Sequence, residues 1–406
     1  MNKPNNLKPI VIHTTPLRLP LKTTISHASA SRKKSESILV QVIRGDLTGY
    51  GEGCPRSYVA GDDLLSSLAW VNDVFGNGPF PISTLDELAR WVNQNKRLID
   101  TYPSAWCAVE MALIDLFARE NSLSVEALLG MPTTKRHSNY SAVLGDQKLY
   151  MFNKQSNLYL SNGMTDFKVK LSGKMARDQK KLSSLEKIVK EHQVEGIRIR
   201  LDANNLWQED FAGAIAFIKN LKGDFFAVEE PLKARNAEQL SNFSIETGLP
   251  VILDESLCTA EDLEQYRHLR GRFIANIKIS RVGGLLRAQS LISTLKSMDW
   301  DIIIGCHVGE TSLLTRCGLV AAAMAGESLI AHEGAFGEYL LFHDPAFPVL
   351  TFSRGGNLNL HKPYYFESSQ GSGQINPDRW SEGLGMTCMM PITLNDDHQQ
   401  TSNHTI

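Results

Sequence analysis

The chain has 406 residues, with 42 lysines and arginines against 44 aspartates and glutamates and a formal net charge of −2. Its composition, 42% hydrophobic and 21% charged, is typical of a globular protein long enough for one large α/β domain and a smaller one. The lack of a basic excess argues against nucleic acid or a membrane as partner, and no apolar run approaches the roughly 20 residues that cross a bilayer.

Cysteine usage and the N-terminal segment predict a cytoplasmic protein. The first segment, MNKPNNLKPIVIHTTPLRLPLK, is broken by prolines and lysines and has no signal-peptide core. The six cysteines lie far apart without a CxxC pair, which favours neither a disulfide framework nor a zinc site. We therefore expect small, buried cysteines in a reducing compartment.

The first third of the chain predicts a small α+β capping unit over residues 1–135. A β-branched, apolar run, SESILVQVIRG from Ser35, is typical of a strand, and a glycine-punctuated segment, GYGEGCPRSYVAGDD, follows it. From Leu64 to Gly130 the pattern is helical, with a helix start at Pro103 and Ser104 and apolar residues at helical spacing after it.

A different pattern follows, in which strand-like runs alternate with helical stretches. The runs are NYSAVLG (from Asn139), DFKVKLSG (from Asp166), GIRIRLDANN (from Gly196), FFAVEEPL (from Phe225), PVILDES (from Pro250), FIANIKIS (from Phe273), DIIIGCHVGE (from Asp301) and SLIAHEGAFG (from Ser328). Such alternation implies right-handed βαβ units and a parallel sheet. We predict an α/β fold with a (β/α)8-type TIM barrel over residues 136–347, (β/α)7β-like if one helix is irregular or replaced.

An open doubly wound sheet is the alternative, but AVLGDQKLY is not the glycine-rich phosphate loop that usually follows its first strand. Residues 348–390, which include YYFESSQGSGQINPD, are expected to pack back onto the capping unit. Residues 391–406 are polar and are expected to form a disordered tail.

Charged residues close the apolar runs of the predicted barrel. They are Lys168 and Lys170 on the second run, Asp202 on the third, Glu229 and Glu230 on the fourth, Asp254 and Glu255 on the fifth, and Lys278 on the sixth. The carboxyl ends of barrel strands meet at one mouth, where active sites lie. Oxygen ligands from separate strands suit a hard cation, Mg²⁺ with Mn²⁺ as a substitute, and no clustered His or Cys argues for zinc. Strand parity alone does not choose between Glu229 and Glu230.

The set KVK, LDANN, VEEPL, LDES and NIKIS resembles the enolase superfamily, specifically the muconate-lactonising subgroup of the mandelate racemase/muconate lactonizing enzyme family. The resemblance includes GYGEG and YPSAWCAVEMALIDL and covers roughly residues 10–375. It implies Asp202, Glu229 and Asp254 as Mg²⁺ ligands, with Asn204 in support. It also implies Lys170 and Lys278 as acid and base on opposite faces of a small-molecule carboxylate substrate, and a homo-oligomer.

The reaction shared by that superfamily removes the proton α to a carboxylate and gives an enediolate. The base must be neutral, yet a free lysine has a pKa of about 10.4. Two ammonium groups about 6 Å apart repel by roughly 3 kcal/mol at an effective dielectric constant of about 20. That energy corresponds to about two pKa units. We therefore expect Lys168 to depress the pKa of Lys170 and to contact the substrate carboxylate.

Substrate contacts are expected from two loops of the capping unit and from the ends of the fifth, seventh and eighth barrel strands. The loop residues are Ser26, His27 and Arg32 in ISHASASRKKSE, and Arg56 and Tyr58 in PRSYVAGDD. The barrel residues are Glu255, His307, Glu310 and Glu333. Glu310 would orient a lysine or cap a helix, and His307 is expected to be a polar neighbour rather than the base. The subgroup's dipeptide epimerases carry Asp-x-Asp after the eighth strand; HEGAFGEYLL has Glu333 without a second acid, which argues against an Ala-Glu-type dipeptide.

Three reactions remain open: racemisation or epimerisation, cycloisomerisation, and β-elimination of water by a dehydrating synthase of the o-succinylbenzoate type. Two opposed lysines suit a 1,1-proton transfer, so a racemase or epimerase of an amino-acid-like carboxylate is the preferred prediction. A catalytically silent paralogue would have lost a ligand or a lysine, and none is lost. A Schiff-base aldolase on the same barrel would leave three carboxylates unexplained.

Overall fold

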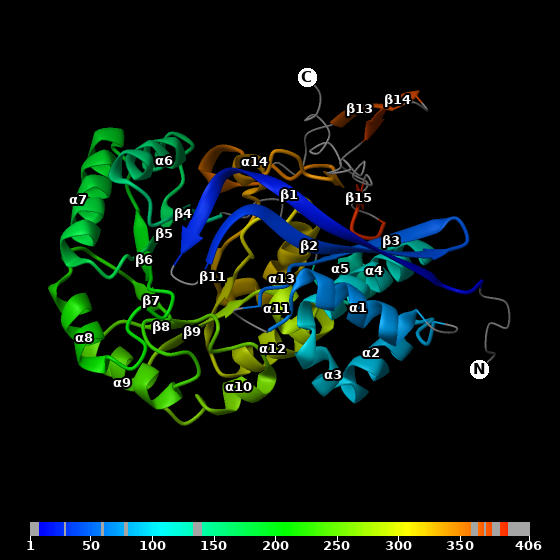
Figure 1. Ribbon diagram of the computed structural model, residues 1–406, viewed down its shortest axis with the longest axis horizontal. Coiled ribbons are helices and arrows are strands. Elements are labelled where there is room, and N and C mark those ends of the chain that lie inside the picture. The colour runs from blue at the N-terminus through cyan, green and yellow to red at the C-terminus, as the bar shows by residue number, and fades with distance from the viewer. Residues whose placement is uncertain are drawn as a thin grey trace, which may run out of the picture.

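A computed structural model describes residues 8–27, 30–57, 61–76, 80–132, 140–358, 364–368, 371–375 and 382–388, with the backbone alone in 23–27, 30–32, 364–368 and 371–375. Its two main parts are an N-terminal antiparallel sheet with helices and a C-terminal barrel of parallel strands (Figure 1). None of the helices in this described part is long and apolar enough to cross a membrane.

The N-terminal sheet has the strand order β1-β2-β3, formed by β1 (Val11–His27), β2 (Ala30–Arg44) and β3 (Leu47–Gly53). Sequence patterns predicted only the middle strand. The first was hidden by Pro16 and Pro20, which face Ile38 and Lys34 in the register with β2. Because β1 is at the sheet edge, each proline can present its missing N–H side outward without breaking an internal ladder.

Five helices follow the sheet: α1 (Leu64–Phe75), α2 (Leu85–Gln94), α3 (Lys96–Thr101), α4 (Pro103–Glu120) and α5 (Val125–Leu128). The glycine-punctuated segment proves to be β3, and its glycines fit it to the almost wholly buried α4. A Cβ at Gly49, Gly51 or Gly53 would collide with carbonyl oxygens of α4. The alternating glycines therefore allow strand and helix backbones to touch.

The barrel strands are β4 (Ala142–Leu144), β5 (Asp166–Lys170), β6 (Arg198–Asp202), β7 (Ala227–Glu229), β8 (Val251–Leu253), β9 (Phe273–Ile277), β10 (Asp301–Ile304) and β11 (Leu329–His332). They form one parallel sheet in chain order. The Ser141 amide donates to the His332 carbonyl at 2.7 Å, which joins the two edges of the sheet.

The helices between these strands are α6 (Leu149–Ser161), α7 (Met175–His192), α8 (Phe211–Asn220), α9 (Ala237–Thr247), α10 (Ala260–Glu264), α11 (Ile279–Val282) with α12 (Leu285–Ser297), and α13 (Ser312–Ala325). They fill the seven gaps between eight strands, so the fold is (β/α)7β-like. This confirms the predicted fold class, including its departure from a regular (β/α)8 barrel.

The remaining elements are α14 (Gly337–Leu340), β12 (Ala346–Phe347), β13 (Tyr364–Ser368), β14 (Gly371–Ile375) and β15 (Thr387–Cys388), with short 3-10 turns at Gly326–Ser328 and Arg354–Gly356. From the C-terminal segment, the Leu384 amide donates to Asp115 of α4 at 2.6 Å. The Val125 amide of α5 donates to the Gly383 carbonyl at 3.0 Å. These contacts agree with a segment packed on the N-terminal unit; the exact domain boundaries stay predictions, and residues 391–406 lie outside the described part.

Buried carboxylates of the N-terminal unit cap two barrel helices. Glu52 of β3 accepts hydrogen bonds from the Thr311 hydroxyl at 2.6 Å and the Leu314 amide at 3.2 Å, at the start of α13. Glu110 of α4 accepts from the Leu285 amide at the start of α12. These acids accept from N–H groups that the first turn of a helix leaves without a partner inside the helix, and so they join the two units.

Candidate active site

Barrel register places a lysine and two acids side by side. Lys170 at the end of β5 pairs with Asp202 at the end of β6, and Asp202 pairs with Glu229 at the end of β7. Asp254 follows β8 directly, and Lys278 follows β9 directly. Buried apolar residues such as Phe167, Val169 and Leu201 anchor these strands, and the polar residue at or just after each strand end reaches the mouth of the barrel.

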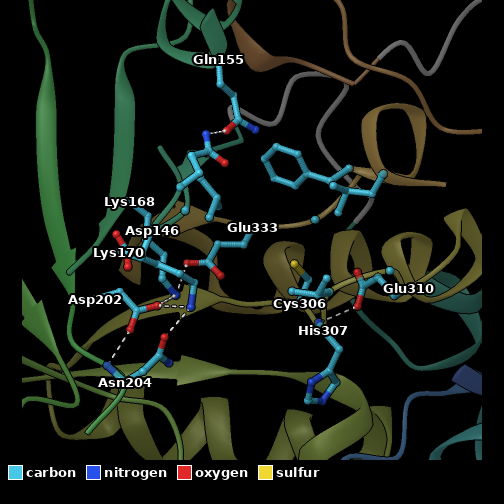
Figure 2. A pocket seen from close by; sticks show the side chains of 18 of the residues that line it. Asp146, Gln155, Lys168, Lys170, Asp202, Asn204, Cys306, His307, Glu310 and Glu333 are labelled. Carbon is cyan, nitrogen blue, oxygen red and sulfur yellow. Dashed lines mark hydrogen bonds and ion pairs between the residues drawn. The ribbon is translucent and has the colours of Figure 1, made fainter. Parts of the chain in front are cut away.

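A cavity of about 590 Å³ opens at this mouth. Its walls include most of the predicted site residues: Lys168, Lys170, Asp202, Asn204, Asp254, Glu255, Lys278, His307, Glu310 and Glu333. Figure 2 shows the lysine pair with Asp202, Asn204 and Glu333 on one side, and His307 with Glu310 on the other. The structure thus brings residues from six strand ends into one pocket, among them both lysines proposed as acid and base.

Lys168 lies at the centre of the carboxylates. Its Nζ is 2.8 Å from Glu229 Oε1, 3.1 Å from Asp202 Oδ2 and 3.2 Å from Glu333 Oε1, and the residue is 4% exposed. Burial lowers the pKa of Lys168, but these three carboxylates outweigh it and hold that pKa well above its ordinary value. Lys168 therefore carries a positive charge that compensates the acids.

A shared carboxylate, Asp202, lies between Lys168 and Lys170. The Nζ of Lys170 is 3.0 Å from Asp202 Oδ2 and donates to Asn204 Oδ1 at 2.6 Å. Asp202 Oδ2 therefore lies against both ammonium groups, so attraction to a shared carboxylate offsets their repulsion. Lys168 contacts three protein acids in this structure, and its expected contact with a substrate carboxylate stays a prediction.

Lys278 Nζ donates to Asp254 Oδ2 at 2.6 Å. Burial lowers the pKa of Lys278, but Asp254 outweighs it and raises that pKa above its ordinary value. Arg281 forms an ion pair with the other oxygen of Asp254 and is 3% exposed. Burial favours a neutral Asp254, but Arg281 and Lys278 hold the pKa of its carboxyl well below the usual range.

The structure distinguishes Glu229 from Glu230, which sequence parity left open. Glu229 faces Lys168 and also accepts from Asn276 Nδ2 at 3.2 Å. Glu230 accepts from the Asp254 amide at 2.7 Å and from the Ser256 amide and hydroxyl at 2.8 Å. Glu230 therefore braces the loop after β8, and Glu229 belongs to the carboxylate cluster.

Two of the predicted neighbours of the site, His307 and Glu310, line the pocket in different surroundings. Burial, reinforced by the charges of Lys278 and Arg56, lowers the pKa of His307 well below its ordinary value, so this imidazole is neutral. Glu310 accepts from the His307 amide at 3.1 Å and from the Thr315 hydroxyl at 3.3 Å, just before α13. The cap of α13 is Thr311, whose hydroxyl accepts from the Leu313 amide, and both roles expected of Glu310 stay predictions.

Glu255 has a buried Oε2 without a hydrogen-bond partner in the described residues. Burial and the neighbouring Asp254 charge raise the pKa of its carboxyl.

Glu333 is paired with an arginine that sequence analysis missed. Arg200 on β6 is fully buried, donates to Glu333 Oε1 at 2.7 Å and also binds Asp166. Burial raises the pKa of Glu333, but Lys168 and Arg200 hold it down at about 2. The sequence did contain a sign of this buried arginine. One face of β6 carries Arg198, Arg200 and Asp202, and in a barrel that face can point inward.

Loop residues expected to contact substrate are placed elsewhere or fall outside the description. The Arg56 guanidinium donates to the Glu36 and Val308 carbonyls, both at 2.9 Å, and to the Pro55 carbonyl at 2.7 Å. It is 2% exposed and ties its loop to the end of the seventh barrel strand without lining the cavity. Tyr58 and the side chains of Ser26, His27 and Arg32 lie outside the described residues.

The cavity is also lined by residues that no motif singled out. They are Asp146, Gln147 and Lys148 after β4, Gln155 and Tyr159 on α6, Arg177 on α7, and Phe336 and Leu340 after β11. Asp146 pairs with Arg177 at 2.9 Å and with Lys181. Only the barrel topology brings these residues to the same mouth, so sequence spacing offered no signal for them.

The donor set fits a hard cation such as Mg²⁺ in residue type. Asp202, Glu229 and Asp254 are buried carboxylates on three neighbouring strands, and Glu229 Oε2 has no hydrogen-bond partner within the described part of the chain. Among the described residues, no group of three His, Cys, Asp or Glu side chains is already arranged around a metal position. Instead, the ammonium groups of Lys168 and Lys278 balance these acids.

Comparison with known families and proteins agrees with this architecture. Residues 9–130 match the mandelate racemase/muconate lactonizing enzyme N-terminal domain, and residues 152–362 match the enolase C-terminal domain-like family. An L-amino acid-D/L-Glu epimerase from Francisella philomiragia is 24% identical over 371 residues, which are 87% of this chain and 99% of that protein. A hydrophobic dipeptide epimerase from Enterococcus faecalis is 24% identical over 80% of this chain and 90% of its own length.

Solved structures show the same fold. A dipeptide epimerase from Enterococcus faecalis V583, complexed with Mg and the dipeptide L-Leu-L-Tyr, has a TM-score of 0.76 at 20% identity, with 94% of this chain and 99% of that chain covered. A substrate-liganded L-Ala-D/L-Glu epimerase from Bacillus subtilis has a TM-score of 0.76 at 21% identity, covering 93% and 98%. The chain therefore belongs to the mandelate racemase/muconate lactonizing enzyme family of the enolase superfamily.

Proposed function

We propose that this chain is a Mg²⁺-dependent isomerase that removes the proton α to a substrate carboxylate, and specifically a racemase or epimerase of an amino-acid-like carboxylate. The single observation that carries the proposal is the placement of Lys170 and Lys278. They come from β5 and from the residue after β9, yet they line one cavity together with Asp202 and Asp254.

Two amines in one pocket suit a proton transfer that begins and ends at the same carbon. One lysine in its neutral form accepts the α-proton from one face, and the other, protonated, returns a proton to the opposite face. Asn204 holds the Lys170 amine at 2.6 Å, and Asp254 holds the Lys278 amine at 2.6 Å. These hydrogen bonds orient the two nitrogens before substrate arrives, which lowers the entropic cost of reaching the reactive geometry.

The residues that would hold Mg²⁺, or Mn²⁺ in its place, are Asp202, Glu229 and Asp254. When bound, the ion would supply positive charge where the substrate carboxylate becomes more negative. Lys168 and Arg200 contribute fixed charge from this chain around Glu229 and Glu333. Lys168, Arg200, Glu229 and Glu333 are all buried, so their charges act where little water screens them.

The relatives support the substrate class without defining it. Their names are those of amino-acid and dipeptide epimerases and of an N-succinyl-L-Arg/Lys racemase from Bacillus cereus, which is 24% identical over 78% of this chain. Two of the similar structures are complexed with Mg and a dipeptide. A carboxylate next to a nitrogen-bearing carbon is the feature these ligands share.

The test is α-proton exchange in D₂O with Mg²⁺, read by mass on a library of single enantiomers. The wild-type protein should exchange the α-proton of both enantiomers of its substrate. Lys170→Ala should lose at least about 10³-fold in exchange of one enantiomer, and Lys278→Ala in exchange of the other, because each base serves one face. Lys174→Ala, an exposed lysine outside the cavity, is the matched control. Wild-type exchange of both enantiomers by Lys170→Ala would refute the proposal.

A further inference from the structure

A buried asparagine on β9 holds one oxygen of Glu229. Asn276 is fully buried in this strand, and its Nδ2 donates to Glu229 Oε1 at 3.2 Å. Glu229 is on β7, and β8 lies between β7 and β9 in the sheet, so the hydrogen bond joins two strands that are not neighbours. An ionised carboxylate only accepts hydrogen bonds, so the Asn276 amide presents its N–H₂ to it.

A second donor binds the same oxygen. The Lys168 ammonium donates to Glu229 Oε1 at 2.8 Å. In contrast, Glu229 Oε2 is buried and has no hydrogen-bond partner among the residues that the structure describes. The two oxygens of this carboxylate are therefore not equivalent: protein donors occupy Oε1, and Oε2 keeps its lone pairs for a metal ion.

Lys168 alone does not fix the direction of that carboxylate. Its Nζ is shared with Asp202 at 3.1 Å and Glu333 at 3.2 Å, and an ammonium group is a compact charge with three rotatable donors. The last torsion angle of a glutamate is broad and roughly two-fold, so its carboxylate turns easily unless a directional donor holds it. Asn276 supplies that direction, because its short, planar amide stands on a buried strand.

The stability of the barrel does not explain an asparagine at this position. Asn276 Oδ1 is buried without a hydrogen-bond partner in the described part of the chain, and such an acceptor destabilises the folded state. Gly305, directly after β10, makes room for this oxygen, because a Cβ at Gly305 would collide with it. An apolar side chain would avoid the cost, so the amide points to a function for its Nδ2.

We propose that Asn276 is a positioning residue for the metal, which fixes the plane of the Glu229 carboxylate so that Oε2 is the oxygen offered to Mg²⁺. The inference rests on the proposed function, in which Glu229 is one of three Mg²⁺ ligands, and adds the residue that orients this ligand. Asn276 acts through Glu229 and not on the substrate. It therefore sets the affinity for the ion, and the lysines set the rate of proton transfer.

Isothermal titration of the full-length protein with MgCl₂ measures this effect without substrate. Asn276→Leu has a similar shape and no donor, and it should raise the Kd of Mg²⁺ about tenfold, because loss of a group that orients a metal ligand typically costs about 10–100-fold in affinity. Asn276→Ala removes the same donor without the added bulk and should act in the same direction. It keeps the test valid if the larger side chain perturbs folding.

Two further readouts separate positioning from a structural role. In the D₂O exchange assay, the Mg²⁺ concentration for half-maximal exchange should rise by the same factor, with kcat at saturating Mg²⁺ within about twofold of the wild type. Ile303→Val is the matched control: Ile303 is fully buried and is the register partner of Asn276 on β10. This control loosens the same layer of the barrel by one methyl group and should leave the Kd of Mg²⁺ unchanged.

The outcomes distinguish this inference from the proposed function. A rise in Kd smaller than about threefold in the folded Asn276 variants would overturn the inference, as would an equal rise in Ile303→Val. Exchange by the wild type that disappears in Lys170→Ala would still uphold the proposed function in either case. Absence of Mg²⁺ binding by the wild type would overturn the inference together with the metal dependence of the proposed function.

Discussion

Replacement of Arg200 by an uncharged residue should lower the free energy of unfolding, because this buried cation compensates two acids in the barrel. Arg200 is fully buried on β6, where its guanidinium donates to Glu333 at 2.7 Å and also binds Asp166. Methionine has a similar length and no charge, so Arg200→Met removes both ion pairs and leaves the space largely filled. Loss of one partner of a buried ion pair typically costs about 3–5 kcal/mol, because the other charge stays buried without compensation.

The size of the loss in the free energy of unfolding should depend on how well each acid is compensated once Arg200 is gone. Glu333 keeps Lys168 at 3.2 Å, and the Asp166 side chain is 16% exposed and can recruit water. We therefore expect a loss of about 3 kcal/mol in the free energy of unfolding, the lower end of that range. Glu333→Gln should cost about 1.5–3 kcal/mol, since Arg200 then loses a charged acceptor.

A double-mutant cycle measured by urea unfolding at neutral pH tests the pairing itself. The double variant should lose less than the sum of the two single variants, with a coupling of about 1–3 kcal/mol. Arg198→Met is the matched control: its guanidinium lies 4.4 Å from the Phe226 ring and is exposed, so its loss should stay under about 1 kcal/mol. Additive single effects, or an Arg200→Met variant as stable as the control, would refute the argument.

Three further predictions concern the fold, its pH dependence and the metal. Gly51→Ala should destabilise the protein by about 3 kcal/mol or more, because the new methyl group would meet the Ala108 carbonyl of α4; an unchanged melting temperature would contradict this. Burial raises the pKa of Glu110 from 4.5 to about 8, so the native state keeps a proton that the unfolded chain releases, and stability falls as pH rises through that window. Glu110→Gln should reduce that slope by about 1.4 kcal/mol per pH unit in unfolding curves between pH 5 and 8, and equal slopes would argue against it. Mg²⁺ at a hundredfold excess over its Kd should stabilise the wild type by about 2.7 kcal/mol, reversed by EDTA and absent in Asp202→Asn, whereas an equal gain in that variant would place the ion elsewhere.

The barrel could be predicted because its signals are local. Each strand is a short apolar run and each helix a periodic stretch, and their alternation has few packing solutions. The location of the charged residue that ends each run could also be predicted without the structure, because the carboxyl ends of parallel barrel strands lie at the same mouth. This rule explains why one cavity is lined by Lys170, Asp202 and Asp254.

Other features depended on contacts between distant segments. β1 was not recognised, because prolines usually speak against a strand and only its position at the sheet edge makes them acceptable. Alternating glycines in β3 looked like a loop until α4 lay against them. Adjacent acids such as Glu229 and Glu230 have the same local pattern, and the loop after β8 decides between them by supplying amide donors to one.

The sequence by itself determined the alternation of strands and helices, the family, and the acids and lysines at the strand ends. These depend on hydrophobic periodicity and on residue order, which any chain displays before it folds. Only the tertiary structure decided that Arg200 neutralises Glu333, that Asp202 stands between two lysines, and that Asn276 and Lys168 bind the same oxygen of Glu229. Electrostatic balance and hydrogen bonding act over a few ångströms in space, and residues far apart in the chain come within that range only when the barrel closes.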